Sequence, residues 1–211
     1  LGAPKHAFFV NSGNIDSMVA HYTAAKRKRS DDAYTAGGKS GRRPDRALTV
    51  YCKLIRQAYP DIPIVIGGLE ASLRRFAHYD YWDDCVYPSI LLDTGADLLS
   101  YGMGEKQTAE IVRRLARGEP VSSLTDIRGT CYLTQPVNTP WGGVQCPDFE
   151  TVCNDKKAYA KATRIQMEEQ DEVRGRIVLQ RHGSRMLEQN PPMQALNTEE
   201  LDRIYELPYM R

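Results

Sequence analysis

Short apolar runs that end in turns containing glycine recur along the first half of the chain. Residues 6–10, 62–66 and 97–101 form such runs, and each leads into a glycine within three residues. A short apolar run bounded by turn signals is typical of a buried strand, and a continuous run such as 62–66 is typical of a parallel sheet. The pattern therefore predicts three buried strands whose ends open into loops.

Amphipathic segments follow the predicted strands. Apolar residues recur at helical spacing over residues 15–22, 44–58 and 105–117. Asp16 or Asn14 can cap the first of these helices, because both side chains accept hydrogen bonds from free backbone N–H groups. A strand, a loop and a helix that recur three times predict an α/β unit with a parallel sheet and right-handed crossovers.

Two stretches of the first half lack a periodic pattern. Residues 30–43 combine three glycines with several charges and predict a long loop, which in a compact domain is often functional. Residues 69–88 predict an irregular stretch, and a short helix is expected near residues 89–93. We expect these two stretches to connect the regular elements rather than to belong to them.

The pattern weakens after Gly118. A strand is predicted at 129–135, an amphipathic helix at 155–172, a hairpin at 176–187, and a last short helix that begins with a capping box of Asn197 and Glu200. We therefore expect an α/β domain at residues 1–128 and an irregular extension or linker at residues 129–211. The predicted fold class is α/β, with a partial flavodoxin-like parallel sheet flanked by helices.

Charge is balanced over the whole chain but not along it. The 28 basic and 27 acidic residues give a net charge of +1, so the chain as a whole has no field that attracts nucleic acid or an anionic membrane. Residues 1–60 contain eleven basic and four acidic side chains, whereas the remainder contains seventeen and twenty-three. The two halves can therefore pair with each other. The longest uncharged stretch, residues 129–147, holds polar residues and prolines, so no membrane span is expected.

The five cysteines contain no CxxC pair, and an odd number does not suit a closed disulfide framework. Reduced thiols and a cytoplasmic location are therefore expected. The apolar segment near the start is too short for a signal peptide. Because the chain begins at Leu1 rather than Met, we expect it to be a piece of a longer protein, truncated at both ends.

Candidate functional residues gather where the predicted parallel strands end. Ligands of open α/β sheets bind at that edge, because loop amides and helix N-termini converge there and glycine allows close approach. Residues 68–82 add carboxylates, two arginines, an imidazole, phenols and an indole within fifteen positions. The resulting candidate face consists of Gly67, Gly68, Glu70, Arg74, Arg75, His78, Asp80, Gly102, Gly104 and Glu105.

No complete catalytic or metal site is predicted. The four histidines are scattered, without an HExxH motif, and no GxSxG motif marks a serine nucleophile. For His78 a structural role is preferred, because no second histidine or cysteine lies at metal-ligand spacing. The candidate face is therefore expected to supply polar contacts and points of backbone approach.

Eight basic side chains lie within residues 26–46. Such groups release counterions when they contact phosphates, so docking of RNA through this loop is one interpretation. The preferred interpretation is a solvated helix end whose cations also pair with the acidic half. We therefore do not expect nucleic acid to be the main partner.

Several long strings identify a resemblance. They are residues 11–23 (NSGNIDSMVAHYT), 43–47 (RPDRA), 64–75 (IVIGGLEASLRR), 78–82 (HYDYW) and 101–105 (YGMGE), followed by 189–192 (QNPP) and 207–209 (LPY). On these strings the chain resembles the N-terminal region of the YgiQ-like family of radical SAM proteins. The resemblance covers nearly the whole chain.

The resemblance implies a larger enzyme. In that family a CxxxCxxC loop holds a [4Fe-4S] cluster, which cleaves S-adenosylmethionine into a radical. No CxxxCxxC string occurs here, so the ligands of the cluster and of S-adenosylmethionine are expected outside this chain. The implied function is that of an accessory domain, which caps or shapes the active site of the downstream radical SAM barrel. The resemblance leaves the substrate of the whole enzyme unknown.

A cobalamin-binding type of α/β domain occupies the same neighbourhood in related radical SAM enzymes. This likeness would place the loops at residues 67–68 and 102–105 beside a cofactor. The DxHxxG motif that supplies a histidine ligand to cobalt is absent from the chain. A corrinoid-binding module is therefore an alternative function, and an RNA-docking module is a second one.

Overall fold

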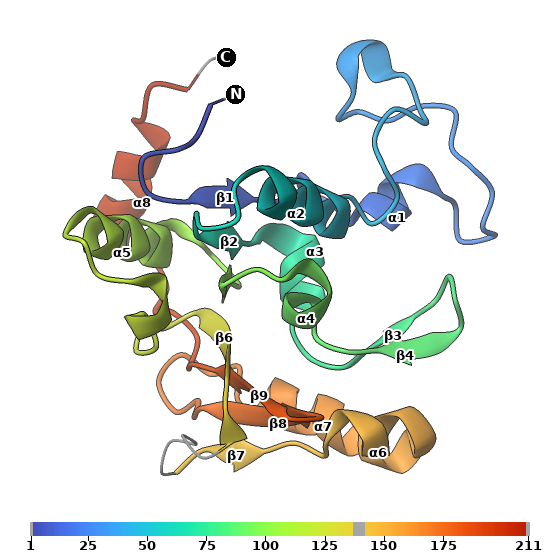
Figure 1. Cartoon of the computed structure of the whole chain (residues 1–211), viewed down its shortest axis with the longest axis vertical. Helices are drawn as coiled ribbons and strands as arrows, with labels where there is room; N and C mark the ends of the chain where they lie inside the picture. The colour runs from blue at the N-terminus through green and yellow to red at the C-terminus, as the bar shows by residue number, and fades with distance from the viewer. Residues whose placement is uncertain (1, 137–141, 210–211) are drawn as a thin grey trace.

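Three parallel strands form one end of the main sheet. The computed structural model describes residues 2–136 and 142–209, and within them the strand order is β1-β2-β5-β6-β9-β8-β7 (Figure 1). β2 (Ile64–Ile66) lies between β1 (Phe8–Val10) and β5 (Leu98–Ser100), parallel to both. The three strands predicted from the apolar runs are confirmed in place and in direction.

The remaining strands continue the same sheet. β6 (Thr130–Thr134) runs antiparallel to β5 and pairs with β9 (Arg185–Gln189), which forms a hairpin with β8 (Val178–His182). β7 (Val144–Gln145) closes this end, parallel to β8. The sheet thus runs across residue 128, while the predicted division into two domains stays a prediction.

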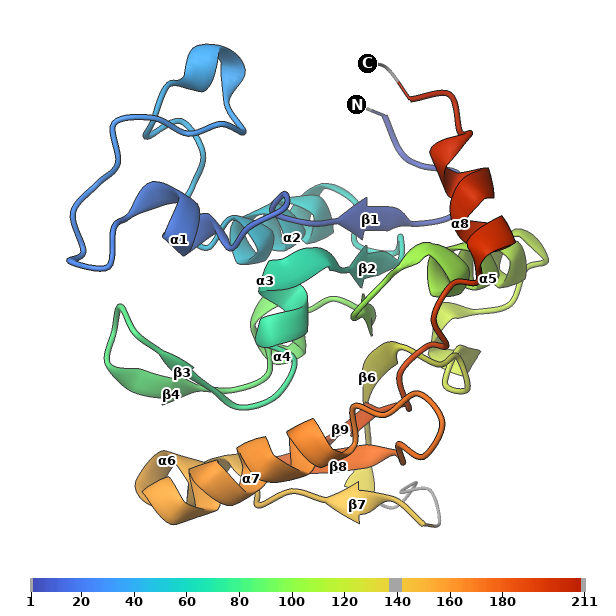
Figure 2. The same cartoon turned by 180° about the vertical axis from the view of Figure 1, so that it is seen from behind.

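Helices flank the sheet on both sides, as the α/β prediction expected (Figures 1 and 2). None of the helices in the described part of the chain has the length and apolar character that a membrane crossing requires. The helices are α1 (Ser17–His21), α2 (Ala47–Ala58), α3 (Gly68–Leu73), α4 (Ile90–Thr94), α5 (Glu105–Ala116), α6 (Phe149–Asn154), α7 (Lys156–Glu168) and α8 (Thr198–Tyr205), with 3₁₀ turns at Ala36–Gly38 and Val121–Ser123.

Apolar side chains fill both faces of the parallel strands. Ile64 and Ile66 of β2 belong to one core cluster together with Leu48 of α2. Val65 points to the other face and packs in a second cluster with Ile111 of α5. Because successive side chains of a strand point to opposite faces, the unbroken apolar run of β2 requires helices on both sides.

The helix α1 is shorter than its apolar stripe predicts. Asp16 caps it by accepting hydrogen bonds from the N–H groups of Met18 and Val19, which confirms the predicted cap. Tyr22 already has extended backbone angles, with φ −130° and ψ 152°. The helix therefore ends one residue before the stripe does, and a long loop leads on to α2.

The prediction of an irregular stretch over residues 69–88 is wrong. The stretch contains most of α3 and a hairpin of β3 (His78–Asp80) with β4 (Cys85–Tyr87). Gly68 begins α3 with φ +80°, a conformation that glycine adopts without strain. The glycine pair therefore starts a helix here, where the sequence pattern indicated only the end of a strand.

Candidate functional site

The loops that follow β1 and β2 meet at the carboxyl ends of the parallel strands. The N–H of Gly67 donates to the carbonyl oxygen of Val10 over 3.0 Å. A Cβ atom on Gly68 would lie 3.2 Å from the Cβ of Asn11. The glycine pair therefore allows two loops to touch, and its predicted role toward a cofactor stays a prediction.

A buried ion-pair cluster lies under these loops. Glu70 is fully buried, and its Oε2 accepts a hydrogen bond from the N–H of Ser17 over 2.8 Å. Its Oε1 lies 3.2 Å from Nη1 of Arg74, whose Nη2 pairs with Asp16 at 2.7 Å. The Ser17 hydroxyl accepts from the N–H of Ala47, the first residue of α2. Glu70 and Arg74, both predicted site residues, thus join α1, α2 and α3.

A second polar cluster lies in the loop between α1 and α2, outside the predicted face. Asp32 is buried and accepts hydrogen bonds from the Arg43 guanidinium at 3.1 and 3.3 Å. Both ring nitrogens of His21 face carboxylates, Nδ1 that of Asp45 at 2.8 Å and Nε2 that of Asp32 at 3.2 Å. These residues are 11 to 24 positions apart, and no periodic pattern links them.

Electrostatics hold the acids of this cluster ionised. Burial alone would raise the pKa of Asp32, yet hydrogen bonds from the Tyr34 N–H and from Arg43 outweigh it, so the pKa lies below its ordinary value. Burial would likewise raise the pKa of Asp45. Its hydrogen bonds with Tyr22 and His21 outweigh burial, so the pKa of Asp45 also lies below its ordinary value. The loop is therefore fixed by charged contacts rather than by apolar packing.

The hairpin β3–β4 holds His78 and Asp80, two further residues of the predicted face. Asp80 is buried, accepts from the N–H groups of Trp82 and Asp83, and pairs with Arg46 at 3.1 Å. Burial lowers the pKa of His78 to about 4, and its Nδ1 lies 3.1 Å from the carbonyl oxygen of Phe76, just before the hairpin. Both residues therefore stabilise the hairpin, which accords with the structural role preferred for His78.

Arg75 connects the parallel strands with the second half of the sheet. Its Nε donates to Oε1 of Gln189 in β9 over 2.5 Å, and its guanidinium stacks over the Tyr101 ring at 4.9 Å. The Tyr101 hydroxyl donates to the carbonyl oxygen of Asn190 over 2.6 Å. Arg75, a residue of the predicted polar segment, thus contacts a residue 114 positions away.

The loop after β5 is the open part of the predicted face. Gly102 has φ +73°, and nothing lies within 4 Å of a Cβ placed on it. Met103 is 55% exposed, and Gly104 and the exposed Glu105 begin α5. The loop borders a pocket of about 300 Å³ together with the segment around Pro192. The predicted residues therefore fall into separate groups along one edge rather than around a single cavity.

The cysteines do not fit an iron–sulfur cluster, which needs several thiolates on one site. Within the described residues, no three side chains of the metal-ligating types come together. Burial raises the pKa of each of three thiols to about 12, so these remain protonated; they are Cys52, Cys131 and Cys146. We therefore assign no step of cluster chemistry to the residues of this chain.

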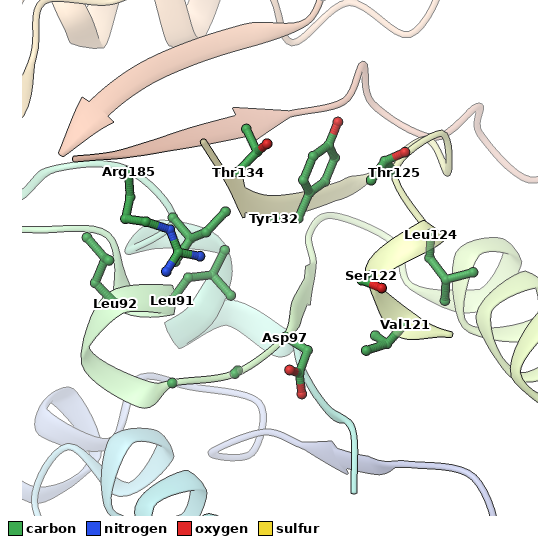
Figure 3. A pocket seen from close by; sticks show the side chains of 13 residues that line it. Leu91, Leu92, Asp97, Val121, Ser122, Leu124, Thr125, Tyr132, Thr134 and Arg185 are labelled. Atoms are coloured by element: carbon green, nitrogen blue, oxygen red, sulfur yellow. The ribbon is translucent and has the colours of Figure 1, made fainter. Parts of the chain in front are cut away.

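A pocket of about 390 Å³ lies away from the predicted face (Figure 3). Asp97, directly before β5, lines it, so the pocket is at the amino end of that strand, and Arg185 of β9 extends toward Leu91 from the other side. The Asp97 carboxylate is already bound by Arg56 and by the N–H of Ile64. No predicted site residue lines this pocket.

Known proteins match the whole chain. A family model described as radical SAM N-terminal matches residues 1–211. UPF0313 proteins from Clostridium botulinum (strain ATCC 19397) and Methanocella arvoryzae are 54% and 53% identical over 211 residues, which is 100% of this chain and 33% and 35% of those proteins. One from Clostridium perfringens (strain SM101) is 50% identical over 212 residues, 32% of its length. The chain thus spans about a third of the curated relatives it matches, and no solved structure matches it.

Proposed function

The chain belongs to the radical SAM N-terminal family, and from this we propose that it is the accessory N-terminal part of a radical SAM enzyme. Membership implies a [4Fe-4S] cluster and S-adenosylmethionine in the whole protein. The cysteines described above do not fit that cluster, so we place its ligands in the downstream barrel. In this proposal the carboxyl edge of β1, β2 and β5 packs against the barrel and shapes its active site.

One observation supports the proposal: the helix that carries the buried Glu70 also presents exposed apolar side chains. Leu69 and Leu73 of α3 are 44% and 63% exposed, although Glu70 and Arg74 of the same segment are buried or nearly so. Met103 adds a third exposed apolar side chain after β5. Exposed apolar groups on a rigid support are typical of an interface.

The charged residues of the edge have a positioning role in this proposal. Glu70 and Arg74 pair with each other, and Glu70 also binds Ser17 while Arg74 binds Asp16. In this proposal both residues hold the loops in place and do not contact a substrate. The open loop at residues 102–105 is the part that approaches the active site. The nature of the substrate stays outside the proposal.

The proposal is tested with the full-length protein. Leu73→Arg places a charge in the proposed interface, and Leu54→Arg, on the 57% exposed Leu54 of α2, is a matched control. After anaerobic reconstitution, we expect all three proteins to carry about four irons per chain. The rate of 5′-deoxyadenosine formation is expected to fall about tenfold in L73R alone, since about 1.4 kcal/mol of lost docking energy corresponds to tenfold.

Thermal unfolding of both variants separates lost docking from lost folding. Both leucines are exposed, so unchanged unfolding temperatures are expected. Equal activity of L73R and L54R would contradict the docking proposal while leaving the enzyme class intact. Absence of iron and of S-adenosylmethionine cleavage in the wild type would contradict the proposed class itself.

A further inference from the structure

Part of the basic segment at residues 26–46 folds around a pocket instead of forming a flat patch. The pocket has a volume of about 230 Å³. Pockets for drug-sized ligands range over roughly 300–1,000 Å³, so this one suits a smaller chemical group. Its lining consists of His21, Tyr22, Lys28, Arg29, Ser40, Gly41, Arg43 and Asp45.

The acidic groups at this pocket are already engaged. Asp45 contacts His21 with Oδ1, and its Oδ2 accepts a hydrogen bond from the Tyr22 hydroxyl over 2.7 Å. Arg43, which also lines the pocket, is mostly buried and pairs with Asp32. These contacts fix the wall and leave its acids little capacity to attract a cation.

The basic groups at the mouth are free to bind. Arg29 donates with Nε to the carbonyl oxygens of Val19 and Tyr22, both at 3.1 Å, which anchors the side chain and leaves its two Nη atoms available. A backbone bridge to Tyr22 holds Lys28 beside the end of α1. In the described part of the chain, neither Lys28 nor Arg29 has an ion pair within 4 Å, and the Ser40 hydroxyl has no hydrogen bond. The charge of Lys28 still contributes to lowering the pKa of Asp45 across the pocket.

Two other cations of the segment are engaged with the β3–β4 hairpin. Arg46 pairs with Asp80 and Asp83 of the β3–β4 hairpin at 3.1 and 2.5 Å. Lys26 donates to the carbonyl oxygen of Trp82 and lies over the Tyr81 ring at 4.9 Å. Arg27, Lys39 and Arg42 also lack an ion pair within the described residues, but they do not line the pocket, so the pocket itself distinguishes Lys28 and Arg29 from them.

We propose that this pocket binds the phosphate group of a small phosphate ester. Lys28 Nζ, the Arg29 Nη atoms and the Ser40 hydroxyl supply donors for the oxygens of the anion. A guanidinium matches two such oxygens at once, and charge-assisted hydrogen bonds are the strong ones. The site is separate from the proposed docking edge, so either proposal can fail without the other.

Calorimetric titration of the full-length protein with inorganic phosphate tests the site, with sodium chloride as the ionic-strength control. Lys28→Met is expected to weaken phosphate binding about tenfold, the effect of losing one charge-assisted hydrogen bond. Arg27→Met removes the same charge from a neighbour that does not line the pocket, and is expected to bind as the wild type does. Ser40→Ala is a second pocket variant, which keeps the net charge.

The outcomes divide clearly. Weaker binding in K28M and S40A, with R27M unchanged, supports the pocket. Absence of phosphate binding by the wild type, or equal loss in K28M and R27M, overturns it. A nucleic-acid surface is the third possible result, and it is tested with a single-stranded RNA of fifteen uridines. RNA binding that is tighter than phosphate binding, falls steeply with salt and weakens equally in K28M and R27M overturns the pocket in favour of such a surface.

Discussion

The backbone N–H of Ser17 donates a 2.8 Å hydrogen bond to the buried Oε2 of Glu70, 53 positions later in the chain. Ser17 begins α1 and Glu70 lies in α3, so this bond fixes the loop after β1 relative to the loop after β2. The loops after β1 and β2 are therefore held together at the carboxyl edge of the parallel strands. This connection supports the proposed docking role.

Glu70→Ala is expected to destabilise the fold by about 3 kcal/mol. Removal of one partner from a buried ion pair leaves the other charge uncompensated, which typically costs 3–5 kcal/mol. Arg74 retains Asp16 as a partner, so the lower value applies. Urea denaturation measures the change, with Glu105→Ala, at an exposed carboxylate of the same face, as the control. Equal stability of the two variants would refute the structural role of Glu70.

Asp32 is expected to make the loop between α1 and α2 sensitive to acid. The folded protein holds this carboxyl with a lowered pKa, so it stabilises the fold above the pKa of the unfolded chain, and this stabilisation is lost as the pH falls through the folded pKa. The free energy of unfolding of the wild type should exceed that of Asp32→Asn at pH 6, and the difference should shrink below about pH 4. Asp31→Asn, at an exposed neighbour, is the control. A difference that does not depend on pH would count against this assignment.

His182 is expected to weaken the fold at mildly acidic pH. Both of its ring nitrogens are buried without a hydrogen-bond partner, the ring stacks on Phe149 at 5.4 Å, and burial lowers its pKa to about 4. The unfolded chain takes up the proton near pH 6.5, so stability is lost as the pH falls from about 6.5 to about 4. At pH 5 this loss is on the order of 2 kcal/mol relative to neutral pH.

The variant His182→Phe isolates this effect, because a phenyl ring keeps the stacking and does not titrate. Guanidinium denaturation at pH 7.5 and pH 5 should show a smaller loss of stability in H182F than in the wild type. His78 retains some pH dependence in both proteins, since burial lowers its pKa as well. Parallel pH dependences in the two proteins would rule out His182 as the source.

The cysteines are expected to differ in reactivity. Cys85 and Cys153 are exposed, and burial raises the pKa of the Cys153 thiol only in part, whereas burial raises the pKa of each of the other three thiols to about 12. Because the thiolate is the reactive form, iodoacetamide at pH 8 should modify Cys85 and Cys153 in the native protein. Peptide mapping by mass spectrometry identifies the modified sites, and all five should react in guanidinium. Fast native modification of Cys52 would contradict the described core.

Local sequence signals sufficed where one apolar face determines an element. The helix α5 was predictable because Ile111 and Leu115 fall on one face and Gly118 follows its end. The strand β2 was predictable because its three residues are apolar and buried. The capping box of α8, Asn197 with Glu200, is also present.

Tertiary contacts decided the elements that the sequence pattern missed. His78 and Asp80 give β3 no alternation of apolar and polar residues, and Asp80 is held by Arg46, 34 positions away. The second polar cluster, between α1 and α2, likewise takes its acidic residues from a loop without a periodic pattern. The sequence of this loop shows only charged residues among glycines, and that composition does not indicate which side chains will contact each other. The predicted face accordingly contained Glu70 and Arg74 but not Asp32 or Arg43.

In the proposed docking, the carboxyl edge of the parallel strands packs against the rest of the enzyme. The most direct measurement places the photocrosslinking residue benzoylphenylalanine at Leu73, and separately at Leu54, in the full-length protein. Both positions are exposed in the described structure. We expect crosslinks from position 73 to peptides beyond residue 211, and none from position 54. Crosslinks from position 54 alone, or none from position 73 beyond residue 211, would contradict it.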